Sequence, residues 1–374
     1  MMTIQQMRVI FGKVEDPRAA NCRFSLFSLI FIALTATLSG CATCFQIALF
    51  ARTKHQALRE QLGIKGRMPS HDTFSRIFRI LDPQAFEATL RDFNQELGLK
   101  IEDGNVLSFD GKSLRNATAE GGRCLPLHVV NVWAAKAGMA LAQFKAPKRN
   151  EVAGALKVLD LLQIKGAIVT ADALHCRADI AQAILDKEAD YVLTLKRNHP
   201  KLYKLVETCI EVAPQKDCTT QPTERSHGRV ERRRATVVPI AAAELNLSFP
   251  GVQAVARVEY WSSKKTKLPA RPYVRLFLLS CVMSSRSLLK IVRDHWKIEN
   301  NLHWRLDVTF GEDKNRARMD NAPQNLAVLR KVAINILSKD KRRLPMNHKI
   351  LQNGWLPNPC FSQTEYSQTT SATP

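Results

Sequence analysis

Two aspartates in this chain of 374 residues each follow a short apolar segment. Asp110 ends the segment 106–110, and Asp172 ends the segment 166–172. We interpret both segments as buried strands, which would hold the two carboxylates at the rim of one sheet. Neighbouring carboxylates repel each other and usually need a cation, and hard oxygen ligands select Mg²⁺ or Mn²⁺. The pair therefore predicts a site for two such ions that promote attack on a phosphodiester bond.

Each aspartate also has an ordinary structural interpretation. Asp110 precedes Gly111, and Asp-Gly is common in turns for purely geometric reasons. Asp172 could instead cap the helix that follows it. Their joint position, after the first and the fourth predicted strands, favours the catalytic interpretation of both.

A third carboxylate is expected on a helix beside the rim, and Glu299 is our candidate. His295, Glu299 and His303 recur at four-residue intervals, which places them on one helical face. Two histidines and a carboxylate leave a zinc site open as an alternative, although the histidines could equally contact phosphate or orient water. Three further acids are rivals of Glu299 that the sequence does not exclude, namely Asp307, Glu312 and Asp313.

The elements that must position these acids follow from hydrophobic periodicity. We expect strands at 106–110, 127–134 and 139–144, a helix near 152–162, a strand at 166–172, a helix near 180–184 and a strand at 190–196. This order predicts an α/β fold, a mixed sheet with flanking helices. It is the order of the RNase H-like nucleases.

Composition divides the rest of the chain. Residues 1–100 show only helical patterns and are expected to form an all-helical N-terminal domain. Residues 101–345 would form the catalytic domain, with a β-rich insertion at about 205–284, a helix from about 285 that carries Glu299, and a last helix at 323–337. The tail, 346–374, is divergent, and its Ser/Thr/Gln-rich end is expected to be disordered.

The chain is strongly basic. It has 55 lysines and arginines against 34 acids, a formal charge of +21, which favours a polyanionic partner and nucleic acid above all. The nine cysteines are an odd number scattered through a large chain, so a reducing cytoplasm fits best. We interpret Cys41 and Cys44 as small buried hydrophobes rather than as zinc or redox ligands.

Residues 24–51 contain no charged side chain and are long enough to span a bilayer. Several Ser and Thr residues lie within this segment, and Ser39-Gly40 interrupts it near its middle. We therefore expect two buried helices packed as a hairpin and no membrane association.

Together these residues resemble a known family, the DDE-type insertion-sequence transposases that include the H-repeat-associated proteins. The resemblance lies in the motifs at 16–18, 69–74, 109–115, 170–176, 191–198, 227–229, 295–300 and 302–308. It implies that Asp110, Asp172 and Glu299 are the catalytic acids and the ligands of two Mg²⁺ or Mn²⁺ ions. It also implies double-stranded DNA as partner, at element ends and target, and a homodimer that pairs two ends in the nucleoid.

Cations and polar groups near these motifs are candidates for contact with DNA, because neutralised phosphates supply most non-specific affinity. The candidates are Lys112, Arg115, Lys196, Asn198, His227, Arg229, His295, His303, Arg316 and Arg318. The chain departs from related transposases around the glutamate, where His295 stands near the usual arginine and Leu306 replaces the expected lysine. Two alternatives therefore stay open: a catalytically inactive DNA-binding remnant, and an RNase H-like nuclease that cuts without joining.

Overall fold

The computed structural model describes residues 2–118, 126–226, 228–240, 248–264 and 267–356. Its N-terminal part is helical, as predicted. The helices are α1 (Ile4–Phe11), α2 (Leu26–Leu38), α3 (Cys44–Thr53), α4 (His55–Leu62), α5 (His71–Ile80) and α6 (Pro83–Glu96). Ser70 and Asp82 cap α5 and α6, because each side chain accepts a hydrogen bond from a first-turn amide.

The uncharged segment forms α2 and α3, which pack against each other as the predicted hairpin. Every residue of α2 is buried, and the hydroxyls of Thr35 and Thr37 donate to the carbonyls of Phe31 and Ala33 in its preceding turn. Burial within the protein therefore explains the apolar run. Among the described residues, no helix combines the length and the apolar content that crossing a membrane requires.

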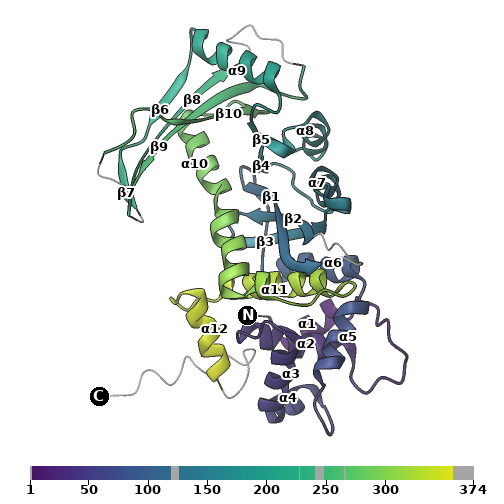
Figure 1. Ribbon diagram of the computed structural model, residues 1–374. Coiled ribbons are helices and arrows are strands. Elements are labelled where there is room, and N and C mark those ends of the chain that lie inside the picture. The colour runs from purple at the N-terminus through teal and green to yellow at the C-terminus, as the bar shows by residue number, and fades with distance from the viewer. Residues whose placement is uncertain (1, 119–125, 227, 241–247, 265–266, 357–374) are drawn as a thin grey trace, which may run out of the picture.

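A ten-stranded mixed sheet is the centre of the rest of the molecule (Figure 1). Its order is β3 (Met139–Lys145), β2 (Pro126–Ala134), β1 (Val106–Thr118), β4 (Ile168–Ala171), β5 (Asp190–Leu195), β10 (Tyr273–Leu279), β9 (Ala254–Ser263), β8 (Arg229–Pro239) and β6 (Asp217–Thr220), with β7 (Glu224–Ser226) on β8. The pairs β1–β4 and β4–β5 are parallel, and the others are antiparallel. The predicted succession of three strands, helix, strand, helix and strand is confirmed.

The predicted β-rich insertion belongs to the same sheet. Its last strand, β10, pairs with β5, and β9, β8 and β6 extend the sheet outward from there. Strand β1 also differs from expectation, because it does not stop at Asp110 but runs on to Thr118, paired with β2. Asp110 therefore lies within a strand, not at its end.

Helices cover both faces of the sheet. Figure 1 shows α7 (Glu151–Asp160) and α8 (Ala178–Leu185) on one side of β1 and β4, and α10 (Ser285–His295) on the other. Helix α9 (Pro200–Val212) contributes to the same hydrophobic cluster as α7 and α8. Alternate residues of β5 point to opposite faces of the sheet: Leu193 packs in that cluster, and Val192 packs in the cluster that contains α10. Helix α11 (Ala322–Lys339) packs on α2 and α6, so one hydrophobic core includes the N-terminal helices and a sheet face.

The segment 346–374 begins with a helix that the sequence analysis did not predict, α12 (Met346–Trp355). Its Ile350 lies close to Gly40, and the Asn353 amide donates to the carbonyl of Leu38 at 3.1 Å. The start of this tail is therefore ordered against α2. Its end lies outside the described residues.

Candidate active site

The parallel pairing of β1 with β4 brings the two aspartates together. Phe109 of β1 and Ala171 of β4 are partners in the register, so Asp110 and Asp172, the next residues along each segment, lie at the same level. Neighbouring strands lie about 4.8 Å apart. Strand β4 ends at Ala171, so the backbone leaves the sheet where the two carboxylates lie.

Asp172 is held by the 3₁₀ turn that follows it. Its Oδ1 accepts a hydrogen bond from the Leu174 amide at 3.0 Å and lies 2.9 Å from Nδ1 of the buried His175. Burial raises the pKa of Asp172, but these contacts outweigh it, so the pKa lies below its ordinary value. Asp172 is therefore ionised at neutral pH.

Among the carboxylates of the site, Asp110 has the pKa that departs most from its ordinary value. Burial, together with the negative charges of Glu299, Asp172 and Glu151, raises the pKa of Asp110 to about 7. Acids raise one another's pKa only when they lie within electrostatic reach. The structure thus brings the three acids singled out in the sequence into one neighbourhood, and adds Glu151 to them.

Glu299 lies in a π-helical turn, Ile298–His303, which continues from α10. Burial raises the pKa of Glu299, and the positive charge of Arg275 partly opposes this. The histidines on either side attach the helix to the sheet. His295 Nδ1 lies 2.9 Å from Oγ1 of Thr170 on β4, and His303 Nδ1 lies 3.5 Å from Asp110 Oδ2 on β1.

The two histidines are largely buried, and their rings are neutral at pH 7. Burial lowers the pKa of His295 to about 4 and that of His303 to about 3. The second ring nitrogen of His303, Nε2, lies 3.3 Å from the Asn131 amide. Both rings therefore position the helix of Glu299, and neither offers a positive charge to DNA at neutral pH.

No group of three or more His, Cys, Asp or Glu side chains within the described residues is arranged to hold a metal ion. This applies both to His295, Glu299 and His303, the zinc alternative, and to the three acids Asp110, Asp172 and Glu299. The two sets differ in chemistry, because the histidine nitrogens are engaged with Thr170 and Asn131. Asp110, Asp172 and Glu299 offer oxygen ligands only, which suits Mg²⁺ or Mn²⁺ better than zinc.

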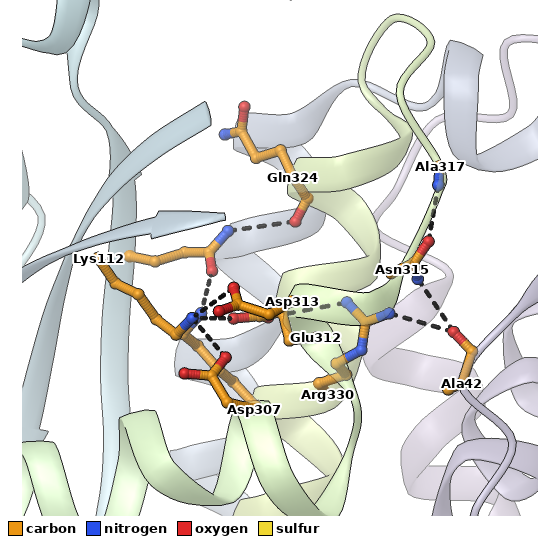
Figure 2. A network of polar contacts seen from close by, with 11 residues as sticks. Ala42, Lys112, Asp307, Glu312, Asp313, Asn315, Ala317, Gln324 and Arg330 are labelled. Carbon is orange, nitrogen blue, oxygen red and sulfur yellow. Dashed lines mark hydrogen bonds and ion pairs between the residues drawn. The ribbon is translucent and has the colours of Figure 1, made fainter. Parts of the chain in front are cut away.

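The rivals of Glu299 surround a buried lysine (Figure 2). Lys112 Nζ lies 2.7 Å from Asp307, 3.3 Å from Glu312 and 3.5 Å from Asp313. Glu312 also lies 3.7 Å from the Arg330 guanidinium. These acids therefore neutralise buried cations, and in this role they differ from Asp110 and Asp172.

This arrangement corrects one expected DNA contact. Lys112 is only 7% exposed, and a DNA phosphate would have to displace its carboxylate partners to reach it. Other candidates lie on the surface. The exposed ones are Lys196, Asn198, Arg229, Arg316 and Arg318, while the Arg115 side chain and His227 lie outside the description. Lys196 lies close enough to Asp172 to lower its pKa.

A line of polar contacts beside Asp110 escaped the sequence analysis. Ser113 Oγ lies 2.8 Å from His128 Nδ1, and His128 Nε2 lies 2.6 Å from a carboxylate oxygen of Glu151. A Cβ atom on Gly111 would lie 2.5 Å from the Glu151 carboxyl carbon. Gly111 therefore serves as space for Glu151 and not as a turn, and no local signal joins residues so far apart in the sequence.

Arg275 was missed as well. Its guanidinium lies 4.5 Å from the centre of the Trp296 ring, and its charge acts on Glu299. It belongs to β10, a strand far from the acids in the sequence, so its position could be known only once β10 was placed beside β5.

Two family models together match most of this chain. A family model described as "Transposase DDE domain" matches residues 101–336, and one described as "DDE_Tnp_1-associated" matches residues 9–94. The Escherichia coli O157:H7 protein named "Putative transposase YncI" is 29% identical, over 90% of this chain and 88% of its own length. The Escherichia coli K12 protein named "H repeat-associated putative transposase YhhI" is 29% identical, over 84% of this chain and 85% of its own length.

Among solved structures, the piggyBac transposase synaptic complex with hairpin DNA aligns with 94% of this chain and 75% of its own. The sequence identity is 12% and the TM-score is 0.44.

Proposed function

This chain belongs to the family of transposases with a DDE domain, and from that premise we propose that it cuts DNA at the ends of an insertion sequence and joins the freed ends to target DNA. The observation that carries the proposal is the electrostatic coupling of Asp110 to Asp172 and Glu299 at the end of β4. The strand order β3-β2-β1-β4-β5, with its parallel centre, supports an RNase H-like catalytic core.

In this proposal Asp110, Asp172 and Glu299 are the catalytic acids. Bound Mg²⁺ or Mn²⁺ would supply charge neutralisation of the phosphate and activation of the attacking oxygen. The protein prepares the ligands for this role, because His175 keeps Asp172 ionised and oriented, while His295 and His303 fix the helix of Glu299 against β4 and β1.

Both reaction steps exchange one P–O bond for another at this site. In the first, the oxygen of water bonds to phosphorus at the element end, the 3′ oxygen leaves and takes up a proton, and a free 3′ hydroxyl results. In the second, that hydroxyl bonds to a target phosphorus, loses its proton, and displaces a 3′ oxygen of the target strand. Each step is a phosphoryl transfer without oxidation or reduction.

DNA is proposed as the partner on charge as well as on family. Lys196 lies within electrostatic reach of Asp172, and Arg229, Arg316 and Arg318 are exposed cations at greater distance along the chain. They are our candidates for contacts with the strands that flank the scissile phosphate. Two ends must be paired for transposition, so we include a homodimer and action in the nucleoid in the proposal.

The test is strand transfer in vitro, with Mg²⁺ and the DNA that flanks the gene. We expect nicking and joining by the natural protein, loss of both in Asp110→Ala and Glu299→Gln, and retention of DNA binding at low salt. Glu96→Gln, which alters an exposed acid on α6, should leave activity intact. Cleavage without joining would indicate a nuclease, and the absence of Mg²⁺-dependent nicking would indicate an inactive remnant; either result overturns the proposal.

A further inference from the structure

The N-terminal helices contain a basic groove that no step above uses. It has a volume of about 510 Å³ and lies between α3, α4 and the start of α5. Three arginines from three different segments line it: Arg52 near the end of α3, Arg59 on α4, and Arg67 in the loop before α5. We call this the arginine groove.

The charge of the arginine groove is little compensated. Within the described part of the chain, no ion pair joins Arg52, Arg59 or Arg67 to an acid. Asp72 is the one acid among the lining residues, and it forms no ion pair with any of the three arginines, so the lining carries three arginines against one carboxylate. Arg59 donates to the carbonyl of Gly66, which holds the loop of Arg67 near α4. Side chains that face one space without acidic partners form a site for an anion.

The side chains that line the groove favour the phosphates of a nucleic acid as the anion. Arg52 and Arg67 are exposed, and the apolar Phe45, itself 60% exposed, lies beside them. Guanidinium groups bind phosphate oxygens in pairs of parallel hydrogen bonds, and several of them along a groove suit consecutive phosphates of one strand. The overall charge of +21 favours the same ligand.

We propose that the arginine groove binds the phosphate backbone of double-stranded DNA at a point remote from the catalytic acids. The inference rests on the proposed function for its choice of DNA as the polyanion. Figure 1 shows α3 and α4 at the end of the molecule opposite to β8 and β9, with the acid-bearing strands between them. The contact is to phosphates, so it is independent of base sequence.

A chain of polar contacts fixes the groove relative to the active site (Figure 2). The carbonyl of Ala42, two residues before α3, accepts hydrogen bonds from the Asn315 amide at 3.0 Å and from Arg330 at 3.2 Å. Arg330 lies 3.7 Å from Glu312, which in turn lies 3.3 Å from Lys112 on β1. DNA held in the groove is therefore held at a set distance from Asp110.

The test measures DNA affinity of the full-length protein without divalent ions, so that no strand is cut. Arg52→Ala/Arg67→Ala is compared with Arg76→Ala/Arg343→Ala, which removes two exposed arginines outside the groove. Fluorescence anisotropy with a duplex gives the slope of log K against log salt concentration. Each lost phosphate contact lowers that slope by about 0.9, so we expect a decrease of about 2 for the groove variant only.

Arg52→Lys/Arg67→Lys keeps both charges and should restore most of the slope. Equal slopes for the groove variant and the Arg76/Arg343 variant would refute the groove. This result is separable from failure of the proposed function, because a protein without strand-transfer activity can still show the slope change. Intact strand transfer with an unchanged slope would remove the groove and leave the proposed function standing.

Discussion

Replacement of Lys112 by methionine tests the assignment of Asp307, Glu312 and Asp313 to structure. Methionine has a similar length, so the change removes the charge with little loss of volume. The side chain of Glu312 is fully buried, and those of Asp307 and Asp313 are 33% and 23% exposed. Removal of one partner from a buried ion pair costs about 3–5 kcal/mol, because the remaining charge is left without compensation.

Two features place the expected loss at the lower end of that range. Water reaches Asp307 and Asp313 in part, and Arg330 stays 3.7 Å from Glu312. We therefore expect Lys112→Met to lower the free energy of unfolding by about 3 kcal/mol. Urea denaturation followed by circular dichroism measures this, and the midpoint should fall while the slope stays constant.

Two comparisons decide the cause. Asp307→Asn in the Lys112→Met background removes the carboxylate that lies 2.7 Å from the lysine and has no other cation beside it among the described residues, so it should recover part of the loss. Lys136→Met breaks an exposed ion pair with Glu102 and should leave stability unchanged within error. If Lys112→Met proved as stable as Lys136→Met, or if Asp307→Asn deepened the loss, the assignment of these acids would be wrong.

Three further predictions concern single residues. Burial lowers the pKa of His295 to about 4, so between about pH 6.5 and pH 4 the unfolded chain binds a proton at this residue and the folded protein does not. The free energy of unfolding should therefore fall by about 3 kcal/mol on acidification through this window. Urea titrations at several pH values measure the fall, and His295→Gln should reduce it. Gly111→Ala must displace the Glu151 carboxylate, so strand transfer should drop at least tenfold while the melting temperature moves by only about 3 °C. Burial raises the pKa of Cys41 to about 11, so iodoacetamide should label exposed Cys22 first, as mass spectrometry of peptides would record, and labelling of Cys41 at a similar rate would contradict its burial.

The sequence was sufficient for elements whose signals are local. The apolar period of 106–196 depends on neighbours within a few residues, and the corresponding strands and helices form in the predicted order. The interpretation of 24–51 as a buried hairpin also rested on a local break, at Ser39-Gly40. Such features need no knowledge of the partners on which they pack.

Sequence reasoning failed where pairing between distant residues decides the outcome. The sequence predicts strands within the β-rich insertion at about 205–284, but not their partners. Their local pattern suits a separate unit or an extension of the sheet, and only the pairing of β10 with β5 distinguishes the two. Gly111 resembled a turn residue because its actual reason, the carboxylate of Glu151, lies on another element. Lys112 resembled a surface cation because its acidic partners stand about 200 residues later.

The positions of the helices relative to the sheet have a consequence for how DNA could be handled. Leu29 of α2 and Phe74 of α5 share one hydrophobic core with Phe277 of β10 and Leu302 of the turn that carries Glu299. Helices that share a core with the catalytic sheet cannot swing as a tethered arm without exposing that core to water. If both the arginine groove and the acids engage DNA, the duplex must therefore adapt to a fixed spacing between them, and its path, not a motion of the N-terminal helices, sets which phosphate reaches Asp110.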